Sequence, residues 1–391
     1  MKSLLNLKLT KEEQFLCQVL VHRDYLNCDR IVELFESVGE KRLLQTCRHN
    51  KISTIAYDAL SVCGVSAELG DWKKDFVEME VRISSYMDAL ESTAKLLEKE
   101  GIQLLALKNS GITRGLYPYY GSCPMGDIDV LVKRSDFKRA HEILTKNGFT
   151  MKFRSPLERE DIEHAFVEGG AEYQVNLPNG DKLWFELQWR PISGRWIQPS
   201  QEPKADELID SSVAIEGCST RLLGPEDNLL QVCLHTAKHT YVRAPGFRLH
   251  TDVDRIVRTC EIDWDLFLSK VVLLKVKTAV YFSLAFAFEL LNTPVSQKHL
   301  ERIKPPFWKK KLITKWLQKV GLFDPDGKKW GRLGYVIFVS LLYDNFGGLL
   351  RGIFPEKNVI KEKYGIRYPW QIPFYYIIRL IDLALKRTLA K

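Results

Sequence analysis

Two aspartates one residue apart interrupt the apolar segment 125–132, Met-Gly-Asp-Ile-Asp-Val-Leu-Val. The alternation predicts a β-strand in which Asp127 and Asp129 point to one face, while the apolar residues beside them point to the other. Like charges on one face repel each other, so the pair predicts a site for a divalent cation that prefers oxygen ligands, such as Mg²⁺. The alternative interpretation is an exposed strand edge with two solvated acids.

A strand, a turn of small residues and a short helix are predicted before this pair. The apolar segment Ile102–Leu107 is the expected strand, and the helix is expected to run through Tyr117. Backbone N–H groups at the start of a helix bind phosphate readily, and a lysine adds a positive charge. The predicted phosphate-binding turn consists of Lys108, Asn109, Ser110 and Gly111.

A third carboxylate is expected from a later strand. The segment 182–190, Lys-Leu-Trp-Phe-Glu-Leu-Gln-Trp-Arg, has the composition of a strand from which Glu186 projects. With Asp127 and Asp129 it would complete a three-acid site. The alternative is a strand acid that pairs with Arg190 or with a lysine.

These motifs, in this order, resemble the uncharacterised bacterial nucleotidyltransferase family of the polymerase-β-like nucleotidyltransferase superfamily. The resemblance implies an α+β fold in which a small mixed sheet is flanked by helices. It also implies that Asp127, Asp129 and Glu186 bind the catalytic Mg²⁺ or Mn²⁺ ions, with Lys108–Gly111 near the phosphates of ATP or another nucleoside triphosphate. Its further motifs are Tyr117-Pro118, Ala140 to Gly148, Glu186 to Arg190, Leu234 to His239, Asp254, Phe354-Pro355 and Tyr364-Gly365, so that it covers roughly 104–379.

Three positions depart from the family pattern. Asn109-Ser110 separates the lysine from the glycine, Ser122-Cys123-Pro124 stands where an arginine is usual, and Gln188 takes the place of a histidine. All three carboxylates are present, so we expect transfer of a nucleoside monophosphate to a hydroxyl or phosphate acceptor, with Glu186 as a candidate base. The alternatives are phosphoryl transfer to a peptide or small molecule, and a catalytically silent nucleotide-binding module.

Two histidines have the spacing of metal ligands. His235 and His239 lie four residues apart on an expected helix, and Asp252 or Asp254 could complete a site with them. The favoured interpretation is structural: these side chains tie the helical part to the sheet. His164 lies where the family often carries a histidine, in an expected loop near the acceptor.

The chain is expected to have three parts, a helical region over 1–100, a catalytic core over 101–215 and a helical, basic region over 216–391. Thr10 to Glu13 resembles a capping box, and the pattern from Ile83 to Glu100 predicts a long helix that Gly101 ends. A further helix is expected between Asp136 and Asn147.

Positive charge is concentrated near the C-terminus. Residues 301–391 hold 19 Lys or Arg and 7 Asp or Glu, a net +12, which leaves −4 of the total +8 for the first 300 residues. A solvated basic face is the plainest interpretation. The interleaved aromatics favour an anionic acceptor or a peripheral membrane contact over sequence-specific nucleic-acid binding, since no DNA- or RNA-reading motif is present. These aromatics are Trp308, Trp316, Trp330, Tyr364, Tyr368 and Trp370.

The compartment is predicted to be the cytoplasm. The best candidate for a membrane span, 335–343, is about half the ~20 residues that a span needs, and the first residues lack the pattern of a signal peptide. The eight cysteines are scattered without a C-x-x-C pair, which predicts buried thiols rather than a zinc site or a disulfide framework. Cys123, just before the acidic pair, is the thiol whose modification would affect the site.

Overall fold

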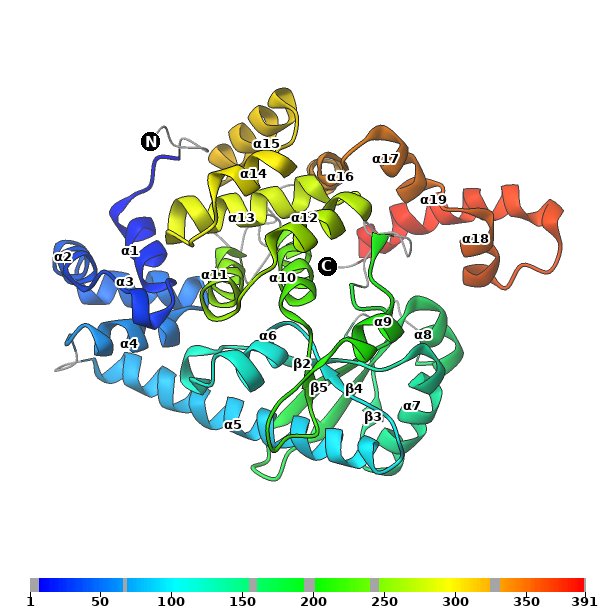
Figure 1. Ribbon diagram of the computed structural model, residues 1–391, viewed down its shortest axis with the longest axis horizontal. Helices are drawn as coiled ribbons and strands as arrows, with labels where there is room; N and C mark the ends of the chain where they lie inside the picture. The colour runs from blue at the N-terminus through cyan, green and yellow to red at the C-terminus, as the bar shows by residue number, and fades with distance from the viewer. Residues whose placement is uncertain are drawn as a thin grey trace.

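The computed structural model describes residues 7–65, 69–154, 160–192, 201–239, 246–323 and 331–389. Helices surround a single mixed sheet of seven strands, so the predicted α+β class is confirmed. In Figure 1 the N-terminal helices lie at the left, the sheet at the lower right, and the later helices above and to the right of it.

The N-terminal region is helical, as expected. Thr10 forms the predicted capping box: its hydroxyl accepts from the Glu13 N–H at 3.2 Å, and its own N–H donates to the Glu13 carboxylate at 2.8 Å. The long helix begins earlier than predicted and ends at Glu98, before Gly101 at φ +74°. The helices are α1 (Lys11–Val19), α2 (Cys28–Val38), α3 (Glu40–His49), α4 (Ser53–Val62) and α5 (Gly70–Glu98).

The sheet has the strand order β3-β4-β5-β2-β1-β7-β6. Strand β2 runs parallel to β5 and antiparallel to β1, and β4 runs antiparallel to β5. The expected strand before the turn is confirmed only in its last part, because β1 is two residues long. The strands are β1 (Leu105–Ala106), β2 (Asp127–Leu131), β3 (Thr150–Met151), β4 (Gly170–Asn176), β5 (Lys182–Gln188), β6 (Val213–Ala214) and β7 (Arg221–Leu222).

The two faces of the sheet differ in polarity because side chains alternate along each strand. Ile128 and Val130 on β2 and Phe185 and Leu187 on β5 are fully buried in the core. The opposite face carries the acids of both strands. Helix α7 contacts β5 and α5. The short helices of this part are α6 (Lys108–Gly111), α7 (Phe137–Lys146), α8 (Ile162–Glu168) and α9 (Ala205–Asp210), and residues Ile112–Leu116 continue α6 as a π-helix.

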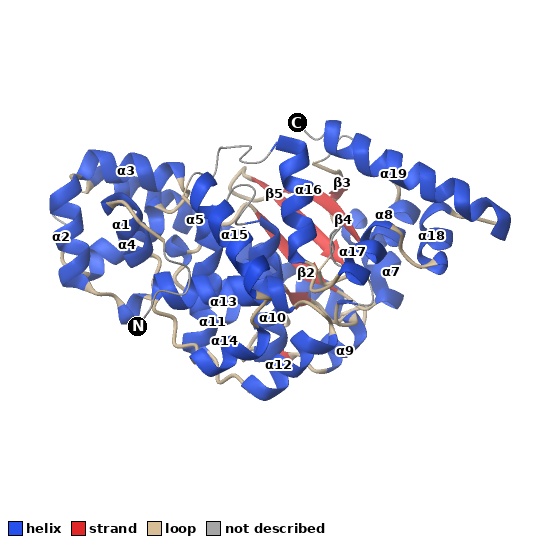
Figure 2. Cartoon of the chain, turned by 90° about the horizontal axis from the view of Figure 1, so that it is seen from above, coloured by secondary structure: helices blue, strands red, loops and turns tan. Residues whose placement is uncertain are grey.

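From Pro225 onward the described elements are all helices, and the last of them extend away from the sheet (Figures 1 and 2). One hydrophobic cluster runs from Phe15 to Tyr343 and joins all three expected parts, whose boundaries stay a prediction. The helices are α10 (Pro225–His239), α11 (His250–Thr259), α12 (Trp264–Leu273), α13 (Lys277–Leu291), α14 (Gln297–Ile303), α15 (Phe307–Val320), α16 (Gly331–Leu342), α17 (Phe346–Ile353), α18 (Lys357–Tyr364) and α19 (Ile372–Leu389).

One expectation about the cysteines is wrong. Cys28 and Cys63 form a disulfide between the start of α2 and the end of α4, with their Cα atoms 5.0 Å apart. The two lie 35 residues apart in sequence, a separation that carries no signal of pairing. Disulfides persist mainly in oxidising compartments, so this bond does not support the predicted cytoplasmic location.

The thiols at Cys17, Cys47, Cys123 and Cys233 are buried, as predicted, whereas those at Cys218 and Cys260 are partly exposed. Within the described residues, every helix is too short or too polar to cross a bilayer.

Candidate active site

The three predicted carboxylates meet on the polar face of the sheet. Parallel pairing of β2 with β5 places Asp129 directly opposite Glu186, and Asp127 lies two residues earlier on the same face of β2. One oxygen of each of the three carboxylates lies within 4.8 Å of the others. The alternative of an exposed strand edge is wrong, because Asp129 is buried and both neighbouring positions of β2 are occupied by strands.

A fourth carboxylate, which the sequence did not single out, continues this row across the sheet. Antiparallel pairing of β4 with β5 places Glu172 opposite Glu186. Acids from three adjacent strands, at Asp129, Glu186 and Glu172, therefore lie side by side. The sequence indicated only that Glu172 lies in an alternating strand. This pattern does not show which residue of β5 lies opposite Glu172.

Asp129 is held from two sides. The Lys108 ammonium donates to its Oδ1 atom at 2.6 Å, and the Gln188 amide donates to the same atom at 3.0 Å. Gln188 is fully buried, and its Oε1 atom has no hydrogen-bond partner. The residue that departs from the family's histidine is therefore a direct partner of the central carboxylate.

Asp127 has a cationic partner that the sequence analysis missed. Arg154 donates from Nη2 to the Asp127 Oδ2 atom at 2.5 Å, and its Nε atom lies 3.4 Å from the Glu172 carboxylate. Its guanidinium also lies over the Trp184 ring, with its carbon 5.1 Å from the ring centroid. Arg154 follows Asp127 by 27 positions, outside any motif, so the sequence carried no signal for this contact.

The predicted phosphate-binding turn is itself the short helix α6, and three of its residues make structural contacts. Lys108 has a φ of +52°, in the left-handed region that non-glycine residues rarely adopt, and its N–H donates to Gln231. The Ser110 hydroxyl accepts from the Asp129 N–H at 3.0 Å. At Gly111 a Cβ atom would lie 2.8 Å from the Ala106 carbonyl oxygen, so glycine allows helix and strand to pack closely. The Asn109 Oδ1 atom is buried without a hydrogen-bond partner.

The ionisation of the cluster reflects burial and the crowding of like charges. Burial raises the pKa of Asp129 to about 6; the nearby Lys108 opposes this shift, and Glu186 adds to it. Burial and the charge of Asp129 also raise the pKa of Asp127. Burial disfavours the Lys108 ammonium, but the charges of Asp129 and Glu186 outweigh this effect and raise its pKa.

The buried Arg255 and the partly exposed Arg248 hold the segment before β2, where the family usually has an arginine. Arg255 of α11 donates to the Ser122 carbonyl oxygen at 2.8 Å, and its guanidinium carbon lies 3.8 Å from the Tyr117 ring centroid. Arg248 donates to the Pro124 carbonyl oxygen. The guanidinium groups near this segment thus come from helices more than 120 residues later in the chain.

Two alternatives from the sequence, an ion pair of Glu186 with Arg190 and a metal site at His235 and His239, are not found in the part of the chain that the structure describes. Arg190 pairs with Glu202 at 2.5 Å rather than with Glu186. His235 and His239 stack edge to face on α10, with ring centroids 4.7 Å apart. Among the described residues, the cluster of Asp127, Asp129 and Glu186 is the one group with the geometry of three metal ligands. The two histidines and their neighbouring acids do not form a second one.

Asp254 joins separate helical parts of the chain, while the predicted tie of His235 and His239 to the sheet stays a prediction. Its carboxylate accepts from the His22 N–H at 2.8 Å, the Arg258 Nε atom at 2.9 Å and the Thr293 hydroxyl at 2.6 Å. His164, which was expected in a loop, lies on α8 beside β4.

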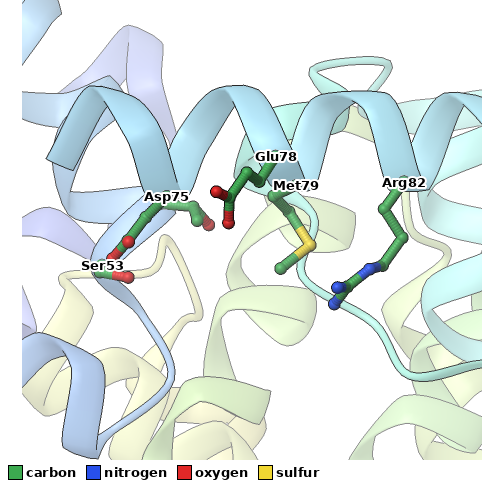
Figure 3. Close-up of a pocket in the computed structure, with 6 residues that line it drawn as sticks. Ser53, Asp75, Glu78, Met79 and Arg82 are labelled. Carbon is green, nitrogen blue, oxygen red and sulfur yellow. The ribbon is translucent and has the colours of Figure 1, made fainter. Parts of the chain in front are cut away.

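A small cavity lies between α4 and α5, away from these residues. It has a volume of about 170 Å³. Figure 3 shows Asp75, Glu78, Met79 and Arg82 projecting from α5 along its wall. Asp75 is already paired with Arg48 by two hydrogen bonds of 2.9 Å. The cavity shares no lining residue with the carboxylate cluster.

The donor set of the cluster fits a hard divalent cation. Mg²⁺ and Mn²⁺ prefer carboxylate oxygens, and three carboxylates within one ligand sphere repel one another unless a cation or protons neutralise them. Asp127, Asp129 and Glu186 supply these oxygens from two rigid strands. The cations Lys108 and Arg154 lie beside them, at the two ends of the aspartate pair.

Comparison with known proteins agrees with this geometry. The family described as "uncharacterised nucleotidyltransferase" matches residues 36–292. The match begins earlier than the resemblance in the sequence indicated and ends before its last expected motifs at Phe354 and Tyr364. No curated protein and no solved structure matches the chain. Because the match covers more than half of the chain and includes all three carboxylates, the chain belongs to this family of uncharacterised nucleotidyltransferases.

Proposed function

We propose that the protein transfers a nucleoside monophosphate from a nucleoside triphosphate to a hydroxyl or phosphate acceptor, in a reaction that depends on Mg²⁺ or Mn²⁺. The observation that carries this proposal is the meeting of Asp127, Asp129 and Glu186 on two paired strands, with ligand oxygens within 4.8 Å of one another. Family membership supports the same class of reaction.

The reaction is an in-line displacement at the α-phosphorus. An acceptor oxygen forms a bond to this phosphorus as the bond to the pyrophosphate oxygen breaks, and the acceptor loses its proton. Glu186 is the candidate base for a hydroxyl acceptor, because it lies at the centre of the acid row, opposite both Asp129 and Glu172. Bound divalent cations would supply charge stabilisation for the attacking and leaving oxygens. Asp127, Asp129 and Glu186 would hold them.

Lys108 and Arg154 have a second role in this proposal. Each now neutralises one aspartate, at 2.6 Å and 2.5 Å respectively. A divalent cation bound to the carboxylates would neutralise the aspartates in place of the Lys108 and Arg154 side chains. A triphosphate bound at this site brings about four negative charges. We infer that the two side chains then contact the triphosphate, which supplies the cationic contact missing at Ser122-Cys123-Pro124.

The silent-module alternative is also tied to an observation. The buried Gln188 amide and the Lys108 ammonium already satisfy Asp129, so the site can be stable without a catalytic cation. Absence of Mn²⁺ binding would therefore favour the silent module, and so would metal-dependent nucleotide binding without turnover.

The first experiment measures Mn²⁺ binding by calorimetry, with and without a non-hydrolysable nucleoside triphosphate. We expect the wild type to bind Mn²⁺ and Asp127→Asn and Asp129→Asn to lose this binding, while Asp181→Asn, in the exposed turn before β5, keeps it. Arg154→Gln should bind Mn²⁺ more tightly without nucleotide, because a competing cation is gone, and should bind the nucleotide more weakly. Lys138→Gln, which breaks an exposed ion pair with Glu163, is the matched control.

The second experiment identifies the reaction. The protein is incubated with Mn²⁺, a cell extract and each of four nucleoside triphosphates labelled at the α- or the γ-phosphorus. Transfer of α-label that is lost in Asp127→Asn supports nucleotidyl transfer. Transfer of γ-label alone would instead support phosphoryl transfer. If Mn²⁺ does not bind to the wild type, or binds equally to the aspartate variants, the proposed site is wrong.

A further inference from the structure

The last helix of the chain presents an apolar stripe to solvent. Trp370, in the 3₁₀ turn just before α19, is followed on the helix by Phe374, Ile377 and Ile381, whose intervals of three and four residues are the spacing of one helix face. Their exposed fractions are 67%, 60%, 57% and 50%, whereas apolar side chains in the core are almost completely buried. A soluble protein rarely exposes a continuous apolar face of this kind without a binding partner.

The other face of the same helix is firmly packed, so the stripe is not the result of an undocked helix. Ile372 joins Ile360 and Ile366 in a small hydrophobic cluster of its own. The Tyr376 hydroxyl donates to the Pro355 carbonyl oxygen at 2.6 Å, and the Arg379 guanidinium donates to the carbonyl oxygens at the end of α17. Helix α19 is therefore fixed with its apolar stripe facing outward.

The segment that carries this stripe is strongly basic. Residues 346–391 hold nine Lys or Arg and three Asp or Glu. Of the basic residues, Arg351, Lys357 and Arg367 are exposed. A second copy of the same face would bring an equal positive charge against this one, and repulsion would oppose dimerisation through the stripe. An anionic surface has the complementary charge.

We propose that α19 lies on an anionic membrane surface, with the stripe from Trp370 to Ile381 inserted at the level of the headgroups. An amphipathic helix with aromatic and aliphatic residues on one face and basic residues around it binds in this manner. The surface belongs to a segment beyond the family match, which ends at residue 292. The inference does not depend on the proposed transfer reaction.

The position of α18 connects this surface with the candidate active site. Helix α18 packs against α19 and also contacts α8, which leads into β4, the strand of Glu172. Binding of α19 to a membrane would thus place the edge of the catalytic sheet near the lipid surface. An acceptor at or in the membrane would then lie near the edge of the catalytic sheet.

The test is flotation of the full-length protein with vesicles of phosphatidylcholine alone, or of phosphatidylcholine mixed with an equal part of phosphatidylglycerol, at low and at high salt. We expect the protein to bind the anionic vesicles, and to bind the neutral vesicles at least about tenfold more weakly. Binding to the anionic vesicles should fall as the salt concentration rises. The triple variant Trp370→Ser/Phe374→Ser/Ile377→Ser should lose binding about tenfold or more. The control Val77→Ser/Val81→Ser/Leu273→Ser changes three exposed apolar side chains elsewhere and should bind as the wild type does.

Two further variants and one measurement keep the proposal falsifiable. Lys357→Glu/Arg367→Glu should weaken binding to anionic vesicles and leave the stripe intact. Circular dichroism and Mn²⁺ binding should be unchanged in every variant, since none lies in the carboxylate site. The proposal is overturned if the wild type does not float with anionic vesicles, or if the triple variant floats equally well. It is also overturned if light scattering shows a wild-type dimer that the triple variant cannot form, because the stripe then binds a second copy.

Discussion

Asp129 on β2 and Asp254 on α11 are both nearly inaccessible carboxylates, but their surroundings have opposite character. Asp254 accepts hydrogen bonds from three donors that belong to three separate segments, at His22, Arg258 and Thr293. Asp129 has one cation and one amide as donors and shares its face of the sheet with three further carboxylates, at Asp127, Glu186 and Glu172.

This is the difference expected between an acid that stabilises the fold and an acid that binds a ligand. A buried charge is tolerated when fixed partners neutralise it, and it then connects the elements that supply those partners. A group of buried acids that crowd one another costs folding free energy, and the raised pKa values of Asp127 and Asp129 reflect this cost. Such a cluster is expected where a cation is bound, and perturbed groups of this kind concentrate at functional sites.

The largest expected effect is on activity. Asp129→Asn removes a proposed metal ligand with almost no change of shape, and we expect nucleotide transfer to fall about a thousandfold or more, since several kcal/mol of charge stabilisation are lost. Its free energy of unfolding without metal should be equal to or higher than that of the wild type, because like-charge repulsion is relieved. Label transfer and urea denaturation measure the two quantities. A variant that is much less stable would mean that Asp129, like Asp254, is structural.

The converse change should affect stability alone. Asp254→Ala leaves the partly buried Arg258 without its carboxylate and removes the acceptor for His22 and Thr293, so the free energy of unfolding should fall by about 3 kcal/mol. Thr293→Val, which removes a single hydroxyl, should cost about 1 kcal/mol. Mn²⁺ affinity per folded molecule should be unchanged in both. Loss of Mn²⁺ binding in folded Asp254→Ala would remove the distinction between the two acids.

The pH dependence of stability should differ between the wild type and Asp129→Asn. The pKa of Asp129 is raised to about 6 in the folded protein, from its ordinary value of 3.8. Between pH 4 and pH 6 the folded state therefore holds a proton that the unfolded state has released. The resulting stabilisation is complete below about pH 4 and is lost as the pH rises through 6.

Relative to Asp129→Asn, the wild type should thus lose on the order of 3 kcal/mol of unfolding free energy across this range. Urea denaturation in a metal chelator at several pH values measures the difference. Burial also raises the pKa of Asp252 to about 6, but Asp252 is present in both proteins and its contribution cancels. Parallel curves for the two proteins would show that Asp129 does not titrate in this window.

The sequence predicted the local part of the site and little of its long-range part. Strand alternation placed Asp127 and Asp129 on one face, and the composition of 182–190 identified the strand of Glu186. Register between strands, which puts Glu186 beside Asp129 and Glu172 beside Glu186, depends on tertiary packing and is not encoded in any short motif. Arg154, Arg248 and Arg255 reach the site from outside the acidic strands, and the Cys28–Cys63 bond joins two helices, so none had a local signal.

Gln188 shares features with the surroundings of both Asp254 and Asp129, and its substitution should have the smallest effect of those considered. Its Nε2 atom donates to Asp129 at 3.0 Å, as a structural partner would, but its buried Oε1 atom has no partner, which is a cost. Gln188→Met removes both the favourable bond and the unsatisfied oxygen, so the free energy of unfolding should change by less than about 1 kcal/mol. Asp129 would keep only Lys108 to orient it, and we expect Mn²⁺ affinity to fall by about tenfold, as it does when a partner that orients a metal ligand is removed. Calorimetry and urea denaturation on the same sample separate the two effects. A large loss of stability with unchanged Mn²⁺ affinity would place Gln188 with the partners of Asp254, among residues that build the fold rather than the site.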